Sequence, residues 1–188
     1  MELASPLPPR LRKSNARLGL IFTALIVLVA GYGATRASAF QWFLLRASLR
    51  GQFPHVQWIT SSELAAWMED RKRPPPVLVD VRTPEEWNVS HLPEARRVDP
   101  GASAAIAMGD IVKETAIVTY CAVGYRSGQL ADHLRAAGFV HVQNLDGGIF
   151  DWANEGRPLV REGVPVTRVH PYNQFWSHLL KDEVRSAL

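Results

Sequence analysis

Short apolar runs alternate with amphipathic stretches along the central part of this 188-residue chain. The apolar runs are rich in β-branched residues and have the length of buried strands, whereas the stretches between them carry apolar residues at helical spacing. Strands that alternate with helices are typical of an α/β domain with a largely parallel sheet. The predicted strands are VLVDV (77–81), ARRV (95–98), AIVTY (116–120) and VHVQNL (140–145), and the predicted helices cover 59–70, 83–87, 127–139 and 147–156.

Two of these helices begin with a recognisable capping signal. Thr60 is followed three residues later by Glu63, and Thr83 is followed by Glu86 with Pro84 at the first helical position. In a capping box the threonine and the glutamate each bind a backbone N–H that the first turn leaves free. We therefore expect helices to start next to Thr60 and Thr83.

The N-terminal part of the chain has a different character. Residues 18–35 contain no charged side chain, and this length just suffices to cross a bilayer core of roughly 30 Å. We predict a single transmembrane helix at 18–35, preceded by a basic tail (1–17) and followed by a juxtamembrane segment (36–55). The basic tail favours a cytoplasmic N-terminus, which would place the folded domain on the non-cytoplasmic, periplasmic side.

A cleaved signal peptide is the alternative for the same segment. Its apolar part has the length of a signal-peptide core, and Ala37-Ser38-Ala39 matches a cleavage site. Cleavage there would release a secreted or periplasmic protein. Arg36 next to that site favours the uncleaved anchor.

Charge and composition exclude several classes of partner. Four of the 21 Lys and Arg residues and one of the 18 Asp and Glu residues lie in residues 1–17, so the rest of the chain carries no net charge. We therefore expect no nucleic-acid partner. The single cysteine excludes an internal disulfide, and the spacing of the six histidines suggests no metal site. We expect no cofactor.

The single cysteine, Cys121, lies between a predicted strand and a predicted helix. Backbone N–H groups of such a turn and the positive end of the helix dipole favour an anion, so the sulfur is expected as a nucleophilic thiolate. Gly124 allows a tight turn, and Arg126 adds a cation for an anionic substrate. A buried, unreactive cysteine is the alternative. The predicted substrate-binding residues are Ala122, Val123, Gly124, Tyr125, Arg126 and Ser127.

Four ordered motifs resemble the rhodanese domain over residues 56–160. They are VLVDVRTPEEW, with Asp80, Val81, Arg82, Glu86 and Trp87; SHLPEA, where Ser90 and Glu94 replace the usual glycines; YCAVGYRS; and NLDGGIFDW, with Gly147, Gly148 and Trp152. The resemblance implies a five-stranded parallel sheet with helices on both faces. It also implies that Cys121 is a catalytic residue that carries sulfur as a persulfide.

The function implied by this resemblance is sulfur transfer. Cys121 would take the outer sulfur of thiosulfate or another sulfane-sulfur donor and pass it to a thiol or to cyanide, in two half-reactions at one site. The N–H groups of residues 122–127 would stabilise the persulfide anion. Asp80 and Arg82 are supporting residues, and for them a structural role and a substrate contact remain open.

Two other functions fit the resemblance. One is a non-catalytic sulfur-carrier, signalling or binding module at the membrane; members of that kind usually lack the cysteine. The other is a phosphatase of the same fold, whose loop is Cys-x5-Arg. Here four residues separate Cys121 from Arg126, and this shorter loop favours sulfur over phosphate.

The C-terminal tail (161–188) carries its apolar residues at helical spacing. We predict an amphipathic helix that packs on the domain, with binding to the membrane surface as the alternative. The apolar positions are Tyr172, Phe175, Trp176, Leu179, Leu180 and Val184.

Overall fold

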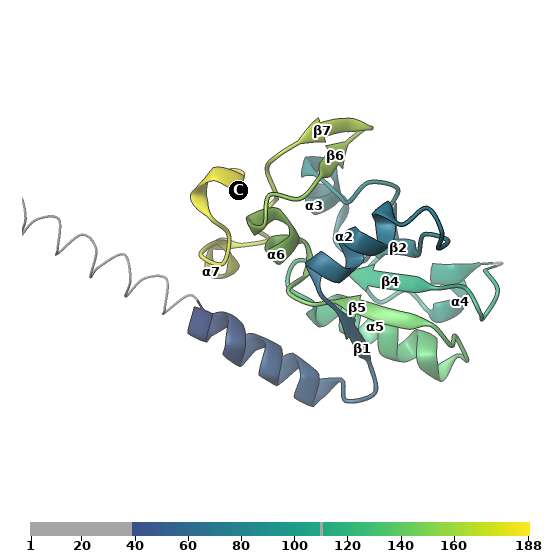
Figure 1. Ribbon diagram of the computed structural model, residues 1–188. Helices are drawn as coiled ribbons and strands as arrows, with labels where there is room; N and C mark the ends of the chain where they lie inside the picture. The colour runs from purple at the N-terminus through teal and green to yellow at the C-terminus, as the bar shows by residue number, and fades with distance from the viewer. Residues whose placement is uncertain (1–38, 110) are drawn as a thin grey trace, which may run out of the picture. The chain divides into compact units, whose positions relative to one another are not determined.

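The central sheet of the protein has five parallel strands. A computed structural model describes residues 39–109 and 111–188 of the chain (Figure 1). The order of the strands across the sheet is β1-β5-β4-β2-β3, so β4 lies in the middle. All four neighbouring pairs run parallel, which confirms the predicted five-stranded parallel sheet. The strands are β1 (Gln57–Ile59), β2 (Val77–Asp80), β3 (Arg96–Arg97), β4 (Ile117–Tyr120) and β5 (Val142–Leu145).

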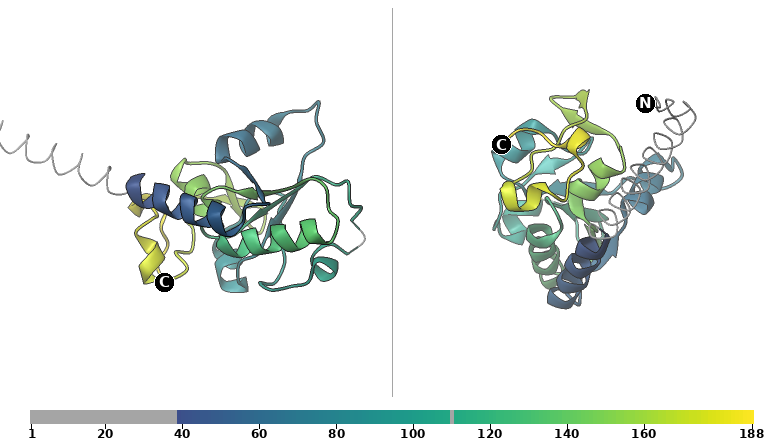
Figure 2. Two further views of the ribbon diagram at one scale, coloured as in Figure 1. Left: turned by 90° about the horizontal axis from the view of Figure 1, so that it is seen from below. Right: turned by 90° about the vertical axis from the view of Figure 1, so that its left-hand side faces the viewer.

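Helices cover both faces of the sheet (Figure 2). Buried residues of α2 and α6 share one apolar cluster, and those of α4 and α5 share another on the opposite face. The helix α3 contacts the strand β6 (Leu159–Arg161). The helices are α2 (Ser61–Glu69), α3 (Pro84–Val89), α4 (Ala104–Met108), α5 (Tyr125–Ala136) and α6 (Gly148–Asn154).

The continuous apolar runs of the central strands follow from this layering. Successive side chains point to opposite faces, so Leu78 and Val118 pack under α2 and α6, while Val79 and Ile117 pack under α4 and α5. A strand covered on both faces needs apolar residues at every position, which is why its sequence shows no alternation. Burying each such side chain stabilises the fold by roughly 1.5–3 kcal/mol.

Both predicted capping boxes form. The Thr60 side chain accepts from the N–H of Glu63, whose carboxylate accepts from the Thr60 N–H at 2.8 Å. Thr83 and Glu86 make the same reciprocal pair at the start of α3. The two helices therefore begin where the sequence places them.

A helix over residues 39–52 precedes β1. Its residues Trp42 and Leu49 are buried, and Arg46 pairs with Asp146 at 3.0 Å, so residues 42–49 of the predicted juxtamembrane segment pack against the domain. Within residues 39–109 and 111–188 we find no helix long and apolar enough to span a bilayer. The predicted basic tail (1–17) and transmembrane helix (18–35) lie outside the described residues.

A two-stranded antiparallel sheet follows α6. Its strands are β6 and β7 (Val164–Val166), and backbone hydrogen bonds of 2.9 Å in both directions join His91 to Val160. The domain end expected at residue 160 falls inside this hairpin. The hairpin and the C-terminal segment belong to the same compact unit as the sheet, Trp42–Leu188.

The C-terminal segment does not form the predicted amphipathic helix. It forms the short α7 (Gln174–Ser177) and a 3-10 turn, η1 (Asp182–Val184). The helix stops because Asn154 of α6 binds the Leu179 carbonyl and the Lys181 N–H, at 2.8 and 2.9 Å, which replaces helical hydrogen bonds by tertiary ones. The prediction that this segment packs on the domain is confirmed, because its apolar residues Leu179, Leu180 and Val184 join the core.

An ion pair lies completely buried where β2 ends. The Asp80 and Arg82 side chains have no exposed surface; the Arg82 Nη2 lies 2.6 Å from the Asp80 Oδ2, and the same nitrogen donates to the Ser90 carbonyl at 2.6 Å. Burial lowers the pKa of Arg82, but the adjacent Asp80 carboxylate raises it, and the net pKa lies above its ordinary value. This pair fixes the chain between β2 and the turn at Ser90.

We expect Asp80→Asn to destabilise the fold by about 3–5 kcal/mol, because it leaves the Arg82 charge buried without its partner. Urea unfolding followed by circular dichroism measures this. The control is Asp99→Asn: Asp99 pairs with Arg97 at the same spacing along the chain, but its side chain is 73% exposed. That pair is worth below about 1 kcal/mol. Equal losses in the two variants would contradict the structural role of the buried pair.

Candidate active site

The predicted strand, turn and helix around Cys121 are present. Cys121 directly follows β4, and the 12-residue helix α5 begins at Tyr125. Gly124 precedes the helix at a φ of +109°, a conformation that side chains disfavour, and its N–H points to the sulfur: the nitrogen lies 3.1 Å from the Cys121 Sγ. The turn thus holds the sulfur at the N-terminal end of α5, where an anion is favoured.

Cys121 lines a small cavity of about 170 Å³, although its side chain is 1% exposed. Its inner side comes from the predicted loop and its outer side from the C-terminal segment. Gly124 and Ser127, also predicted to bind substrate, do not line it; the Ser127 hydroxyl is buried and has no hydrogen-bond partner among the described residues. The lining residues are Cys121, Ala122, Val123, Tyr125, Arg126, Tyr172 and Trp176.

Arg126 already has an anionic partner inside the protein. Its guanidinium donates to both carboxylate oxygens of Glu86, at 2.7 and 2.8 Å. The Glu86 side chain is 1% exposed and that of Arg126 is 18% exposed, so water screens the pair weakly. The sequence leads us to expect Arg126 as a cation for the substrate, but the structure places that charge in an internal ion pair.

Both members of this pair have shifted pKa values. Burial raises the pKa of Glu86, but hydrogen bonds from Arg126 and from the Thr83 N–H lower it by more than burial raises it. The net pKa of Glu86 therefore lies below its ordinary value. Burial lowers the pKa of Arg126, while Glu86 and a Cys121 thiolate raise it well above its ordinary value. Both groups are therefore charged at neutral pH, and their charges cancel at the cavity wall.

The backbone of the active-site turn is held from behind by α6. The Cys121 carbonyl accepts from the Ile149 N–H at 2.9 Å, and the Ala122 carbonyl accepts from the Phe150 N–H at 3.1 Å. These are N–H groups that the first turn of a helix leaves without partners. Gly148 makes the approach feasible, since a Cβ there would lie 2.4 Å from the Cys121 oxygen.

Residues of the segment 49–58, which ends in β1, also contact the turn. A Cβ on Gly124 would lie 3.3 Å from the Trp58 ring and 3.5 Å from the Leu49 side chain. The Phe53 ring packs at 5.8 Å from that of Tyr125. The turn is therefore enclosed between α6 and the stretch from 49 to 58.

Sequence reasoning missed three residues around the sulfur. Glu86 is recognisable as a capping residue, yet nothing in the sequence shows that its carboxylate also reaches Arg126. Tyr172 and Trp176 appear in the sequence as part of a helical repeat, and their place beside the cysteine depends on the tertiary fold. Asp80 and Arg82, predicted as supporting residues, do not line the cavity.

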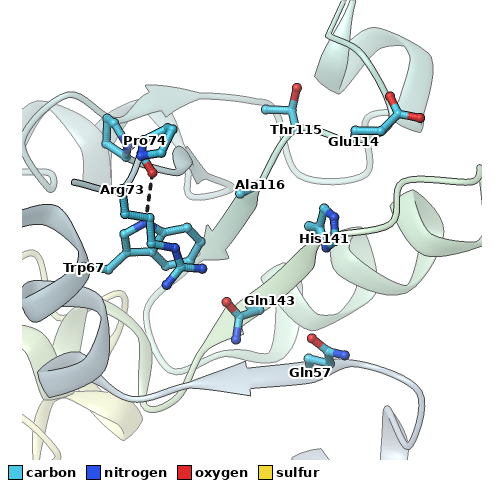
Figure 3. A pocket seen from close by; sticks show the side chains of 10 residues that line it. Gln57, Trp67, Arg73, Pro74, Glu114, Thr115, Ala116, His141 and Gln143 are labelled. Atoms are coloured by element: carbon cyan, nitrogen blue, oxygen red, sulfur yellow. Dashed lines mark hydrogen bonds between the residues drawn. The ribbon is translucent and has the colours of Figure 1, made fainter. Parts of the chain in front are cut away.

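A larger cavity, of about 640 Å³, lies where β1, β4 and β5 begin (Figure 3). Cys121 lies at the other end of these strands, because it follows the last residue of β4. Polar side chains such as His141 and Gln143 line it, and Arg73 lies over the Trp67 ring at 3.4 Å. None of its lining residues is a cysteine. We also find no group of three or more potential metal ligands within residues 39–109 and 111–188. The chemistry of a nucleophile therefore belongs to the smaller cavity.

We expect Gly148→Ala to destabilise the protein more than Gly156→Ala does. Both glycines have positive φ, +57° and +70°, so alanine costs about 1–2 kcal/mol of backbone strain at either. A Cβ at Gly156 meets nothing within 4 Å, whereas one at Gly148 overlaps the active-site turn. The overlap should cost about 1–3 kcal/mol more. Urea unfolding compares the two, and equal losses would mean that the turn gives way freely.

Comparison with known proteins agrees with this geometry. Residues 60–155 match the model of the rhodanese-like domain family. A protein named sulfurtransferase from Allochromatium vinosum is 40% identical over 84 residues, which cover 45% of this chain and 78% of that protein. The probable adenylyltransferase/sulfurtransferase MoeZ of Mycobacterium tuberculosis is 30% identical over 101 residues, which cover 53% of this chain and 25% of that protein.

A solved structure has the same fold. The rhodanese-like domain of an Anabaena protein, determined in solution, superimposes with a TM-score of 0.51 at 26% identity, over 56% of this chain and 80% of that one. The family match covers the strands β2 to β5, the turn at Cys121 and α6. This chain belongs to the rhodanese-like domain family.

Proposed function

We propose that the protein is a sulfurtransferase in which Cys121 carries the transferred sulfur. The observation that supports this most directly is the environment of the thiol: it lines a cavity, and the Gly124 N–H donates to its sulfur. A cysteine that only filled the core would need neither. The relative named sulfurtransferase supports the same class.

The proposed reaction has two steps. The Cys121 thiolate attacks the outer sulfur of a donor R–S⁻, where R is SO₃⁻ in thiosulfate; a new S–S bond forms, the donor's S–S bond breaks, and sulfite leaves with the bonding electrons. The persulfide then gives its outer sulfur to an acceptor. With cyanide the product is thiocyanate, and the Cys121 thiolate is restored without any external oxidant or reductant.

The surroundings of Cys121 suit the persulfide anion. The turn lies at the N-terminus of α5, so free N–H groups and the helix dipole favour negative charge there. Removing one preorganised donor from an anion-stabilising site typically costs about 10²–10³ in rate. The cavity is smaller than the roughly 300–1,000 Å³ of sites that enclose drug-sized ligands, so it suits the sulfur-bearing end of a donor.

Two other functions are alternatives to sulfur transfer. A non-catalytic binding or sulfur-carrier module would use the same fold without turnover. A phosphatase would need a loop that surrounds a phosphate, and its arginine would have to face that anion. The pairing of Arg126 with Glu86 favours sulfur transfer over phosphate chemistry, because it leaves no uncompensated cation at the cavity wall.

We expect Cys121→Ser to abolish thiocyanate formation from thiosulfate and cyanide, with no change in circular dichroism. Before cyanide is added, intact-protein mass spectrometry of the native chain should show a gain equal to one sulfur atom, and the variant should show none. Turnover that persists in Cys121→Ser would refute the role of the thiol. Hydrolysis of an aryl phosphate by the native chain, without sulfur loading, would favour the phosphatase.

We also propose that residues 18–35 anchor the protein in a membrane, with the domain on the periplasmic side. The uncharged run and the basic tail before it support this. Full-length protein should stay in the membrane pellet after an alkaline carbonate wash. Release of full-length protein would contradict the anchor, and a mature N-terminus at Phe40 would favour a cleaved signal peptide.

Sidedness needs a reporter other than the buried Cys121. Val164 is 62% exposed on the hairpin, so Val164→Cys in a Cys121→Ser background gives an accessible thiol. A membrane-impermeant maleimide should label it in intact cells. Labelling that requires cell lysis would place the domain in the cytoplasm.

A further inference from the structure

One side of the Cys121 cavity comes from outside the matched family domain. Tyr172 and Trp176 line it, whereas the family match ends at residue 155. The remaining lining residues all belong to the turn and the start of α5. The outer side of this cavity is therefore formed by the C-terminal segment, outside residues 60–155.

The C-terminal segment is fixed to the domain. Within the segment, the Val169 N–H donates to the Val184 carbonyl at 2.8 Å, and the Asn154 side chain of α6 donates to the Leu179 carbonyl at 2.8 Å. Leu179 and Leu180 are buried in the same apolar cluster as the α6 residues. The segment therefore holds its aromatic residues in a defined place beside the cysteine.

Both aromatic residues have local contacts that fix their backbone. Tyr172 has a φ of +66°, and its N–H donates to the His170 Nδ1 at 3.0 Å. The Asn173 side chain accepts from the Trp176 N–H at 3.1 Å, which caps α7. The Arg126 guanidinium lies over the Tyr172 ring at 4.7 Å from its centre, so the ring also contacts the charged edge of the cavity.

The charge balance of the cavity is unfavourable for a doubly charged donor. Apart from the Cys121 thiolate, Arg126 is the one charged side chain among the lining residues, and Glu86 neutralises it at 2.7 and 2.8 Å. Thiosulfate carries two negative charges and has no ring or alkyl group to place against Tyr172 and Trp176. A singly charged donor with a flat or apolar group matches the cavity on both counts.

We propose that Tyr172 and Trp176 form an aromatic wall that selects the sulfur donor, favouring singly charged organic sulfane-sulfur compounds with a flat or apolar group over inorganic thiosulfate. The inference rests on the proposed sulfur transfer and specifies its substrate class. Tyr172 and Trp176 act as specificity residues, because they contact the donor's non-reacting group and leave the sulfur to Cys121.

Thiosulfonates provide the probe. The Cys121 thiolate attacks the outer sulfur of benzenethiosulfonate, a new S–S bond forms on the cysteine, the donor's S–S bond breaks, and benzenesulfinate leaves with the electron pair. Methanethiosulfonate reacts in the same way and carries the same single charge, but it has no ring. The ratio of kcat/KM for these two donors, with cyanide as acceptor, reports the contribution of the wall.

We expect this ratio to fall by about three- to tenfold in Tyr172→Ala and in Trp176→Ala, the effect of losing one aromatic contact. Tyr172→Phe keeps the ring and should keep the ratio. The control is Phe43→Ala, since Phe43 is an aromatic residue that is 63% exposed and does not line the cavity. An unchanged ratio in both Tyr172→Ala and Trp176→Ala would overturn the proposal.

A binding measurement separates this inference from the proposed function. Benzenesulfonate has no transferable sulfur, and its dissociation constant can be measured by NMR titration of the full chain. Weaker binding in Tyr172→Ala and Trp176→Ala, with Phe43→Ala like the native chain, would support the wall even if no donor were turned over. Equal binding in all four proteins would overturn it. Turnover that fails with every donor would count against sulfur transfer alone.

Discussion

The active-site turn depends on a backbone clamp between two elements of the fold. The carbonyls of Cys121 and Ala122 accept hydrogen bonds from the first free N–H groups of α6. Without this contact, the N–H groups of Ile149 and Phe150 and the two carbonyls of the turn would lack hydrogen-bond partners in a buried place. The space for this contact exists because Gly148 has no side chain. The position of the nucleophile is thus set by main-chain atoms, with little freedom left to side chains.

A second connection joins the turn to β2 and α3. The Glu86 carboxylate accepts from the Thr83 N–H at 3.1 Å, and the same carboxylate binds Arg126 through both its oxygens. One side chain therefore caps a helix and neutralises the cation beside the nucleophile. The fully buried Asp80–Arg82 pair lies just before it and binds the Ser90 carbonyl. Together these contacts make the chain from 80 to 90 a rigid support for Arg126.

Much of this architecture could be predicted from the sequence, because the signals are local. The capping boxes at Thr60 and Thr83, the strands 77–81 and 116–120, and the glycine turn after Cys121 all depend on neighbouring residues. The strand β1 has three residues and the helix α4 has five, which is too few to show a periodic pattern in the sequence. Glu94, where the family usually has glycine, adopts a φ of +59°, so the backbone retains the shape that the motif implies.

The parts that escaped prediction depend on contacts between distant residues. The apolar spacing from Tyr172 to Val184 is helical, yet the Asn154 side chain donates to the Leu179 carbonyl and accepts from the Lys181 N–H, which ends the helix and redirects the chain. The charge of Arg126 is visible in the sequence, but its neutralisation by a residue 40 positions away is not. Such long-range pairings cannot be inferred from one sequence without the fold.

Residues inside and outside the family match both surround Cys121, and this affects the study of isolated rhodanese-like domains. The nucleophile and its turn lie within residues 60–155, whereas Leu49 and Trp58 support the turn from one side and Tyr172 and Trp176 enclose the other. A fragment cut at the family boundaries would keep the cysteine but open its surroundings to water on two sides. Substrate profiles measured on such excised fragments would lack the aromatic wall that we propose as the selector of the donor.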